Sequence, residues 1–417
     1  MDGIEARWTP EEADPCQQEQ RPAGSVPVSQ HRASKSGLRR RSVIAVSAFA
    51  VLGGAVAVWL PSASADQPAD RPNGKVQRSL DDLTRDNDFP AALASVRDEK
   101  GHIRNYTAGV ANREKKRSRV PVDGQVRIAS TTKLYTATVI LQLVGEGRID
   151  LDAPIETYLP GLVRGDGIDG RNITVRQLLQ HTSGLPNYTE AMPKFSKWRH
   201  TFVDDYDLLD MAFKEKASFA PGRGWEYSNT NYTLAGLIVQ KVTGRPIGEE
   251  ITDRIIEPLQ LRHTYWPGEG EQTIRERHPH GYAFDEPGGP LMDATELDPS
   301  WGGAAGQLVA RPSDVNRFLT VLMDGKLLKP AQFKEMRTTV QTKGLHDGWR
   351  YGLGIVEMPL SCGGVAWGHG GDFDGYENRN GVTDQGRAAT VAVTALPSTL
   401  ESAESVNEAL DTALCTR

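Results

Sequence analysis

The stretch Arg127-Ile128-Ala129-Ser130-Thr131-Thr132-Lys133 decides the fold, because it places a serine and a lysine three residues apart where a helical pattern begins. Over residues 130–144, Leu134, Ala137, Leu141 and Val144 recur at helical spacing. Positions i and i+3 share one face of a helix, so Ser130 and Lys133 can touch. Ser130 is the only serine in the chain with a lysine three residues on.

This pair has a chemical interpretation. A serine hydroxyl is a poor nucleophile unless a nearby base takes its proton. Lysine acts as that base only as a neutral amine, which requires burial or positive neighbours. The helix N-terminus opposes a charged Lys133 and favours an oxyanion at Ser130. Taken alone, however, an N-cap serine beside a surface lysine is the more ordinary interpretation.

A second motif, Tyr227-Ser228-Asn229, follows a segment that contains Pro221, Gly222 and Gly224, so we expect it on a loop. From a loop, Tyr227 can pass a proton between the nucleophile and a leaving group. Asn229 can offer its amide to a substrate carbonyl or to Lys133. The alternative is a tyrosine packed against the helix that starts near Asn231.

The third motif, His369-Gly370-Gly371, ends an apolar stretch. Gly370 and Gly371 would let a substrate approach a strand edge closely. We expect the backbone N–H groups of Ser130 and Asp372 to form an oxyanion hole. An ordinary histidine at the end of a strand is the alternative for His369. In this order, the three motifs predict a serine hydrolase in which lysine and tyrosine replace a Ser-His-Asp triad.

Patterns elsewhere predict one sheet built from both ends of the folded chain. Residues 91–111 read as a hairpin, with its turn at residues 99–101. Helical signals dominate residues 130–295, strands return from Trp367, and residues 387–396 precede a final helix. We therefore expect an α/β (α+β) fold, with residues 77–417 as the hydrolase domain and a helical subdomain at about 130–295 inserted in it.

The N-terminal residues indicate export. Residues 1–37 are polar, Arg39-Arg40-Arg41 precedes an apolar run at 43–60, and Ala63 and Ala65 resemble a cleavage site. We expect residues 1–65 to be an extension with an export signal, of the Sec or Tat type, and residues 66–76 to be a linker. An uncleaved membrane anchor is the alternative. The predicted location is secreted or at the cell surface, with membrane contact only if the segment is uncleaved.

Two cysteines, Cys362 and Cys415, follow the predicted cleavage point, and an exported chain lies where disulfides persist. We expect them to be paired, with two buried thiols as the alternative.

Composition excludes several classes of function. The net charge is -6, and we identify no basic stripe after the first 41 residues, so we expect no nucleic-acid partner. The nine histidines form no metal-binding motif. We therefore expect no metal and no cofactor.

With these motifs in hand, residues 80–415 resemble the penicillin-recognising serine hydrolases. The similarity is greatest to secreted Streptomyces-type D-alanyl-D-alanine carboxypeptidases, with class C β-lactamases and family VIII esterases as relatives. Further matching stretches are Gln180-His181-Thr182-Ser183-Gly184, Asn229-Thr230-Asn231-Tyr232 and Tyr351-Gly352-Leu353-Gly354. The resemblance implies a β-lactamase/transpeptidase-like fold, in which an antiparallel sheet with flanking helices packs on a mostly helical domain. The active site lies between the two.

The resemblance also implies residue roles. Ser130 forms an acyl-enzyme, Lys133 and Tyr227 handle its proton, and Asn229 and His369 assist. Trp301 matches a tryptophan that lines the cleft, although plain core packing explains a lone aromatic equally well. The spacing of Cys362 and Cys415 matches a disulfide of the carboxypeptidase.

Departures from the family pattern concern the substrate. His369 stands where class C β-lactamases have lysine, which favours the peptidase branch. The carboxypeptidase has a carboxylate-binding arginine where this chain has Val356. Asp372 and Asp374 near the third motif would repel a substrate carboxylate and suit an amine-bearing or neutral substrate. Arg379 is the residue that could supply the missing positive charge.

We therefore expect an exported serine hydrolase, first of all a penicillin-binding enzyme of the D-alanyl-D-alanine carboxypeptidase type. The alternatives are an esterase or D-aminopeptidase-type amidase, a β-lactamase, and a non-catalytic binding or scaffold protein. The expected partners are small peptide, ester or β-lactam substrates and cell-wall peptidoglycan.

Overall fold

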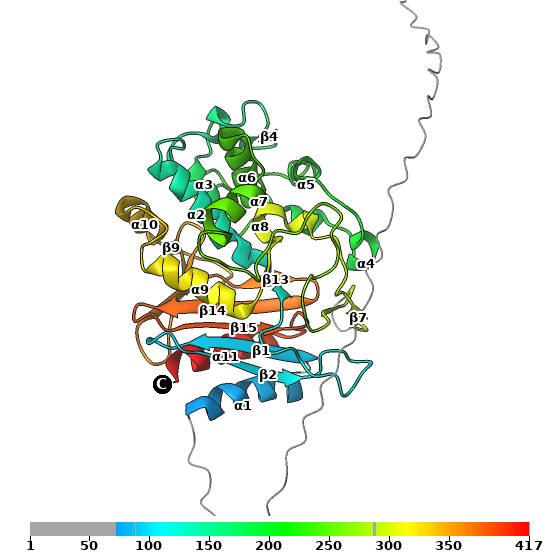
Figure 1. The fold of residues 1–417 in the computed structure, drawn as a ribbon. Coiled ribbons are helices and arrows are strands. Elements are labelled where there is room, and N and C mark those ends of the chain that lie inside the picture. Colours follow the sequence, from blue (N-terminus) through cyan, green and yellow to red (C-terminus); the bar gives the residue numbers. More distant parts are fainter. Residues whose placement is uncertain (1–71, 88, 287–288, 417) are drawn as a thin grey trace, which may run out of the picture. The chain divides into compact units, whose positions relative to one another are not determined.

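The computed structural model describes residues 72–87, 89–286 and 289–416 (Figure 1). The predicted extension, export signal and first part of the linker fall in residues 1–71, outside the described residues. Helix α1 begins at Pro72, inside the stretch predicted as a linker. No helix within the described ranges has both the length and the apolar character needed to cross a bilayer.

A nine-stranded antiparallel sheet forms the base of the domain, with the order β2-β1-β15-β14-β12-β11-β10-β9 and with β13 paired to β14. Its strands are β1 (Ala91–Arg97), β2 (Ile103–Gly109), β9 (Val340–Gln341), β10 (Arg350–Tyr351), β11 (Val356–Pro359), β12 (Val365–Gly368), β13 (Gly371–Phe373), β14 (Tyr376–Thr383) and β15 (Ala388–Val393). Residues 388–393 of the central strand β15 are all buried, which explains its unbroken Ala, Val and Thr composition. The sheet joins strands from both ends of the folded chain, as predicted.

Three two-stranded ladders lie outside this sheet. They are β3 (Val126–Arg127) with β8 (Val309–Ala310), β4 (Arg164–Gly165) with β5 (Ile168–Asp169), and β6 (Tyr282–Ala283) with β7 (Met292–Asp293). In the first of them, β8 holds the strand that leads directly into the Ser130 motif.

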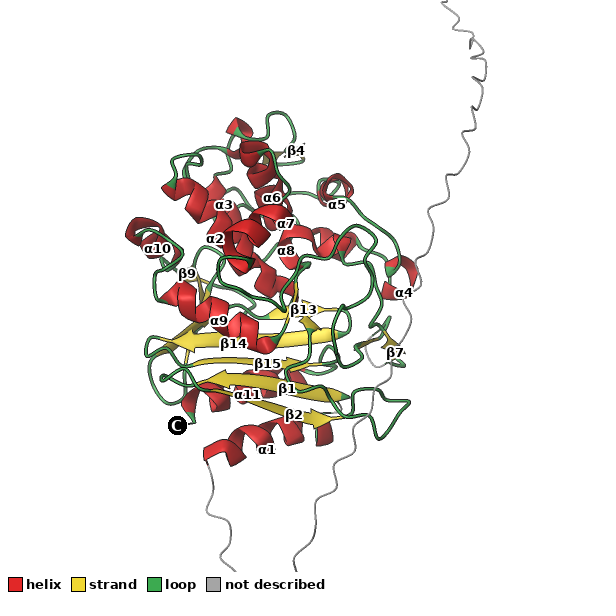
Figure 2. Cartoon of the chain, in the orientation of Figure 1, coloured by secondary structure: helices red, strands yellow, loops and turns green. Residues whose placement is uncertain are grey.

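Helices cover both faces of the sheet (Figures 1 and 2). On one face lie α1 and α11, which bury apolar residues such as Leu80 and Leu410 against it. On the other lie α9 and, beyond it, a mostly helical part. The helices are α1 (Pro72–Arg85), α2 (Thr132–Gly145), α3 (Val175–Leu179), α4 (Phe195–Trp198), α5 (Asp205–Ala212), α6 (Thr230–Thr243), α7 (Ile247–Ile251), α8 (Gly303–Gly306), α9 (Pro312–Met323), α10 (Pro330–Met336) and α11 (Leu400–Cys415).

Helix α2 is the centre of the helical part. Its residues 132–141 are all buried, and it packs against α6, α7, α8 and α10. Local sequence determines where two neighbouring helices start and end. Thr174 and Gln177 form a capping box at the start of α3, and Gly244 ends α6 in a left-handed conformation. Five single turns complete the helical structure: η1 (Ala129–Thr131), η2 (Ile155–Thr157), η3 (Tyr188–Ala191), the π-helical η4 (Thr252–Ile256) and η5 (Ser300–Gly302).

The predicted fold class is confirmed, with two differences in detail. Strands return before Trp367, since β9, β10, β11 and the start of β12 precede it. These strands have two to four residues each, too few for an alternating pattern to be visible in the sequence. Helices α9 and α10 also extend the helical structure beyond residue 295.

Candidate active site

Ser130 is presented on a strained turn at the base of α2. The turn η1 spans Ala129–Thr131, and the buried Ala129 has φ of 49°. A non-glycine residue in this left-handed region costs free energy and is held there by its surroundings, which is common at functional sites. The turn brings Ser130 to the surface of a cavity while its neighbours Ala129 and Thr131 stay buried.

Lys133, the second residue of α2, is fully buried. Its Nζ is 3.0 Å from Ser130 Oγ, 2.7 Å from Asn229 Oδ1 and 2.8 Å from the carbonyl oxygen of Ala305. Burial lowers the pKa of Lys133 well below its usual value of 10.5, and Asp372 offsets part of this effect. A neutral amine has two hydrogens and one lone pair. Asn229 Oδ1 and the Ala305 carbonyl oxygen can only accept hydrogen bonds, so the lone pair is left for the Ser130 hydroxyl.

Tyr227 approaches the same serine from the irregular segment before α6. Tyr227 and Ser130 line the same cavity, and Lys133 Nζ lies 4.9 Å from the centroid of the Tyr227 ring. Burial raises the pKa of the Tyr227 phenol, so the group keeps its proton at neutral pH. The backbone N–H of Asn229 donates to Asn187 Oδ1 at 3.0 Å, which fixes this segment.

His369 ends a hydrogen-bonded chain of buried side chains. The Tyr351 hydroxyl lies 2.8 Å from His369 Nε2 and 3.2 Å from His181 Nε2. Burial lowers the pKa of His369 to about 3 and that of His181 well below its usual 6.5. Both imidazoles are therefore neutral, and His369 cannot replace the positive charge of a lysine.

Two asparagines on β14 connect the first and third motifs, and the sequence analysis did not identify them. Asn378 Nδ2 donates to the Ile128 carbonyl at 2.9 Å, and Asn380 Nδ2 donates to the His369 carbonyl at 2.7 Å. Thr131 Oγ1 lies 2.8 Å from both the His369 carbonyl and Asn378 Oδ1. All these groups are buried, so the network sets the distance between Ser130 and the His369 strand.

The motifs meet at a cavity of about 870 Å³. Of the predicted site residues, Ser130, Tyr227, Asn229, His369, Gly370 and Asp372 line it. The sequence analysis missed Asn187, the segment 344–347 with Trp349, and Ala403, Glu404 and Asn407 of α11, which line it as well. These residues come from parts of the chain that the motifs do not mark.

Gly371 and Trp301 were predicted to bind substrate, but neither lines this cavity. A Cβ on Gly371 would lie 2.3 Å from the Ile128 carbonyl oxygen, so this glycine lets β13 pack against the Ser130 turn. The Trp301 ring stacks on Phe373 with centroids 4.3 Å apart and meets Trp198 edge-on at 4.8 Å. Asp374 also lies outside the lining, and burial raises its pKa to about 6.

Asp372 and Arg379 set the charge of the cavity. Arg379 Nη1 lies 2.7 Å from Asp372 Oδ1, and Nη2 lies 2.7 Å from Glu377 Oε1. Arg379 Nε donates to Asn407 Oδ1 at 3.1 Å, so each guanidinium nitrogen already has a partner. Burial raises the pKa of Glu377 to about 8, and Arg379 opposes this shift. The Asp372 side chain is 59% exposed, so its carboxylate is accessible from the cavity.

A disulfide joins Cys362, between β11 and β12, to Cys415 at the end of α11. It joins α11, the helix that supplies Asn407, to the turn between β11 and β12, and β12 leads to His369. Over the residues that the structure describes, no three His, Cys, Asp or Glu side chains gather as a metal site.

Comparison with known proteins agrees with this geometry. Residues 76–414 match the protein family described as Beta-lactamase. Among solved structures, a D-stereospecific amidohydrolase from Streptomyces sp. is 39% identical, with a TM-score of 0.74 over 81% of this chain and 97% of that chain. A D-amino acid amidase from Ochrobactrum anthropi SV3, complexed with L-phenylalanine amide, is 29% identical, with a TM-score of 0.73 over 82% and 97%.

Curated relatives match over shorter stretches. A teichoic acid D-alanine hydrolase of Staphylococcus aureus is 29% identical over 230 residues, which are 54% of this chain and 53% of that protein. Protein flp of Staphylococcus aureus is 35% identical over 137 residues, 33% of this chain and 27% of that protein. The chain thus spans about half or less of the length of these curated relatives.

Proposed function

The chain belongs to the beta-lactamase family of serine hydrolases, and from this premise we propose that it is an amidohydrolase that acts on D-amino acid derivatives with a free α-amino group. Ser130 would form an acyl-enzyme with the D-aminoacyl group and release the amine, and water would then regenerate the serine. This is the amidase alternative of the sequence analysis. We prefer the amidase to the carboxypeptidase because carboxylates line the cavity.

The observation that carries the proposal is the ion pair of Asp372 with Arg379. The exposed Asp372 carboxylate is held 2.7 Å from a guanidinium that has no free nitrogen. Asp347 and Glu404 add two more carboxylates to the lining. An ammonium group is attracted to such a cavity, and a terminal carboxylate is repelled. A free α-amino group beside the reacting carbonyl therefore suits Asp372.

In the proposed acylation, Lys133 and Tyr227 accept or donate each proton that moves. Neutral Lys133 takes the proton of Ser130 as Oγ bonds to the amide carbon. Tyr227, which stays protonated, donates its proton to the leaving nitrogen as the C–N bond breaks, and Lys133 then returns a proton to Tyr227. The backbone N–H groups of Ser130 and Asp372 remain our candidate oxyanion hole.

The similar proteins support this choice of substrate. One solved relative is named a D-stereospecific amidohydrolase, the other a D-amino acid amidase, and the curated relative a teichoic acid D-alanine hydrolase. An amide and an ester of a D-amino acid share the acyl group that Ser130 would carry. The ester activity is thus a second form of the same function.

The test compares D-alanine amide, L-alanine amide and N-acetyl-D-alanine amide. We expect turnover of the first, little of the second, and none of any substrate by Ser130→Ala. Asp372→Asn should raise KM for D-alanine amide about tenfold or more, since a charged hydrogen bond contributes about 1.5–3 kcal/mol. The matched control is Asp347→Asn, which removes another cavity carboxylate that has no ion pair with Arg379. Preference for the N-acetylated amide would contradict the proposal.

The D-alanyl-D-alanine carboxypeptidase remains the competing candidate, and Arg379 is the residue that would bind its substrate's carboxylate. Intact mass after incubation with benzylpenicillin distinguishes the two. A lasting adduct at Ser130, together with turnover of N-acylated D-alanyl-D-alanine, would favour the carboxypeptidase.

We also propose that the protein acts outside the cytoplasm. The basic, apolar and Ala-x-Ala segments of residues 39–65 support export, and the disulfide is suited to an oxidising compartment. N-terminal sequencing of protein recovered from culture medium tests this, and we expect Asp66 as the first residue. Recovery only from the cytoplasm would contradict it.

A further inference from the structure

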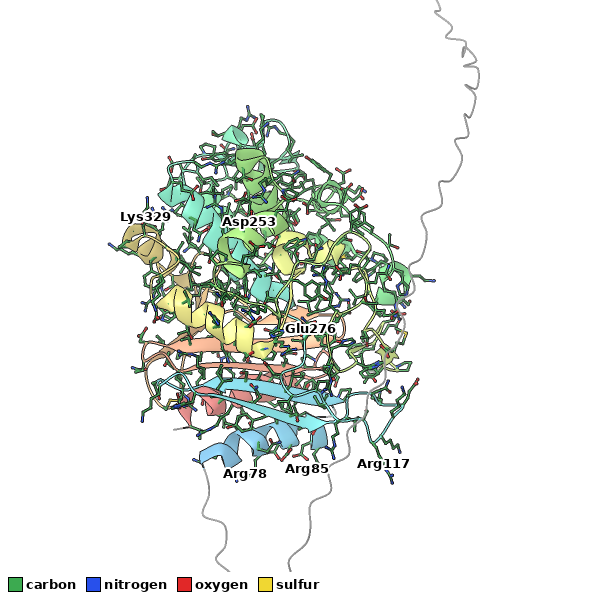
Figure 3. The ribbon with its side chains drawn as sticks, viewed as in Figure 1. Arg78, Arg85, Arg117, Asp253, Glu276 and Lys329 are labelled. Atoms are coloured by element: carbon green, nitrogen blue, oxygen red, sulfur yellow. A yellow bond between two sulfur atoms is a disulfide. The ribbon has the colours of Figure 1, made fainter. Side chains whose placement is uncertain are left out.

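A cationic loop connects β2 to β3. Residues 113–119 read Arg113-Glu114-Lys115-Lys116-Arg117-Ser118-Arg119, with five basic residues in seven. This run corrects the sequence analysis, which identified no basic stripe after residue 41. Within residues 113–119 every residue except Ser118 is exposed, and Arg117 projects from the tip of the loop away from the sheet (Figure 3).

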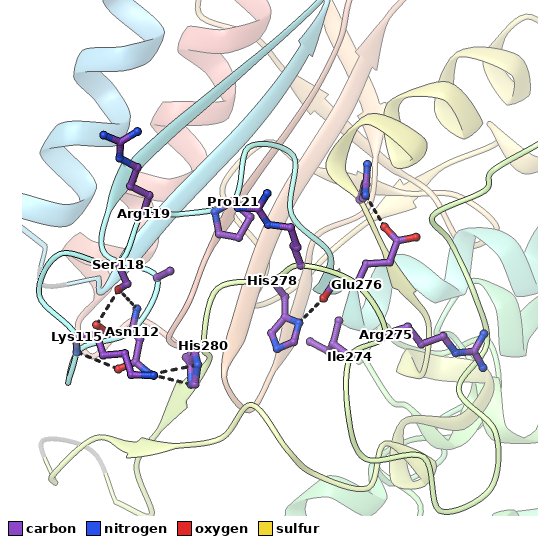
Figure 4. A pocket seen from close by; sticks show the side chains of 13 residues that line it. Asn112, Lys115, Ser118, Arg119, Pro121, Ile274, Arg275, Glu276, His278 and His280 are labelled. Atoms are coloured by element: carbon purple, nitrogen blue, oxygen red, sulfur yellow. Dashed lines mark hydrogen bonds and ion pairs between the residues drawn. The ribbon is translucent and has the colours of Figure 1, made fainter. Parts of the chain in front are cut away.

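The loop forms one wall of a groove of about 840 Å³. The facing wall is the segment Ile274-Arg275-Glu276-Arg277-His278 (Figure 4). Arg311 also lines the groove and forms an ion pair with Glu276 of this wall. Five cationic side chains line the groove, with Glu276 as the single carboxylate; the five are Lys115, Arg119, Arg275, Arg277 and Arg311.

Much of this charge is uncompensated. Glu276 pairs with Arg311 and His263, and Arg275 pairs with Glu271. Within the described part of the chain, Lys115, Arg119 and Arg277 have no ion-pair partner, and all three are exposed. The chain as a whole is acidic, with a net charge of -6, so this groove has the opposite sign to the rest of the molecule.

We propose that this groove binds a linear polymer with phosphodiester anions, of the polyol phosphate class. Exposed cations on two facing walls can contact successive phosphates along an extended chain, as in other electrostatic grooves that follow a polyanion backbone. The walls are fixed, because Asn112 Oδ1 accepts the backbone N–H of Glu114 at 2.8 Å and His278 Nδ1 lies 2.6 Å from the Glu276 carbonyl. Such a site would hold the enzyme on an anionic polymer without using the cavity at Ser130.

The side chains of the groove favour a polyol phosphate over a nucleic acid. Single-stranded nucleic acid binds by stacking its bases on aromatic side chains as well as by charge. The lining of this groove contains no Phe, Tyr or Trp. It also contains no exposed large apolar residue that would enter a bilayer, since Ile274 is 4% exposed.

This inference does not rest on the proposed function. The groove and the Ser130 cavity share no lining residue. A variant of the groove should therefore change polymer binding and leave hydrolysis of small substrates intact, and the two proposals can fail separately.

The experiment measures binding of the full chain to synthetic poly(glycerol phosphate) at several salt concentrations. The test variant is Lys115→Gln/Arg119→Gln/Arg277→Gln. The matched control is Lys214→Gln/Lys216→Gln/Lys241→Gln, which neutralises three exposed cations of the helical part. Both keep residues 1–71, so any contribution from Arg39-Arg40-Arg41 is equal.

We expect the test variant to bind at least about tenfold more weakly at low salt, with a log–log salt slope reduced by about two. The control should behave as the wild type, and hydrolysis of a small ester should be equal in all three. Equal binding by the test and control variants would overturn the proposal. Tighter binding to single-stranded DNA with the same number of phosphates would reassign the groove to nucleic acid, and tighter binding to phosphatidylglycerol vesicles would reassign it to a membrane. Competition by millimolar inorganic phosphate as strong as that by the polymer would reduce the site to a free-phosphate site.

Discussion

The hydroxyl group of Tyr351 lies 2.8 Å from Nε2 of His369, and this contact fixes the proton positions of a buried chain. The backbone N–H of Ser228 donates to His181 Nδ1 at 3.2 Å, so the proton of neutral His181 is on Nε2 and points to Tyr351. Tyr351 then donates to His369 Nε2, and His369 Nδ1–H donates to the Gly370 carbonyl at 2.5 Å. The second motif is thus linked to the third through Tyr351.

Tyr351→Phe should lower kcat/KM about tenfold with little change in KM. The variant keeps the ring but leaves His369 Nε2 without a donor, and a misplaced group near the nucleophile costs transition-state stabilisation. Imidazole ¹⁵N shifts measure the tautomer of His369, and we expect them to change from a single Nδ1–H form to a mixture. Unchanged shifts with lowered activity would mean that Tyr351 only fills space.

Tyr135→Phe is the matched control for this variant. Tyr135 is also fully buried, stacks on Phe318 with centroids 3.8 Å apart, and has a hydroxyl with no hydrogen-bond partner among the described residues. Removal of an unpaired buried hydroxyl should leave stability equal or higher and leave activity unchanged.

The pH dependence of kcat/KM should reflect the ionisation of Lys133 rather than that of His369. Lys133 must lose a proton to act as the base, so kcat/KM should rise with pH through the lowered pKa of Lys133. Asp372 favours the charged ammonium, so Asp372→Asn should lower this pKa further and move the acid limb to lower pH. The measurement uses an ester without an amino group, so that substrate binding by Asp372 does not interfere.

Asp347→Asn serves again as the control, because Asp347 is not among the groups that shift the pKa of Lys133. It should leave the limb in place. A limb that stays fixed in Asp372→Asn would contradict the assignment. His369, with a pKa lowered to about 3, should add no further step above about pH 4.

The sequence predicted those helices and strands that are long enough to show a periodic pattern of apolar residues. The hairpin of β1 and β2, helices α2, α6 and α11, and strand β15 each carry a full period of apolar residues. Strands β9 and β10 have two residues each; β9 pairs with β10, and β10 pairs with the four-residue strand β11, so none of these strands is long enough to show a pattern. Helix α1 begins in a Pro-, Asp- and Gly-containing stretch that reads as a linker.

The sequence predicted only those site residues that belong to a short motif. Ser130 and Lys133 are three residues apart, and the structure brings them to 3.0 Å. Asn378 and Asn380 act on groups about 250 and 11 residues away, and a pattern of single residues on a strand does not reveal such partners. Gly371 shows the converse case, since its motif position suggested room for substrate while its surroundings show a packing contact.

The disulfide should stabilise the fold without taking part in catalysis. Cys362 and Cys415 are 53 residues apart in sequence, and closing such a loop in the unfolded chain corresponds to about 4 kcal/mol. Cys362→Ser/Cys415→Ser should therefore lower the free energy of unfolding by a few kcal/mol, measured by urea denaturation. Small-ester hydrolysis at 25 °C should be nearly unchanged. Reduced wild-type protein should match the variant, and a stability equal to that of the oxidised wild type would mean that the bond adds nothing.

Gly370 and Gly371 are neighbours in one motif, yet alanine should have different effects at the two positions. At Gly371 a Cβ would lie 2.3 Å from the Ile128 carbonyl oxygen and 2.6 Å from Asn378 Nδ2, both of which hold the Ser130 turn. The backbone must move, so Gly371→Ala should cost about 1–3 kcal/mol of stability and most of the activity. At Gly370 the nearest atom is Arg379 Nη1 at 3.0 Å, at the end of a side chain that can adjust. Gly370→Ala should keep wild-type stability, and its KM for an amine-bearing substrate should shift modestly because Arg379 holds Asp372. If both variants lost activity equally while remaining folded, room for substrate rather than packing against Ile128 would explain the second glycine.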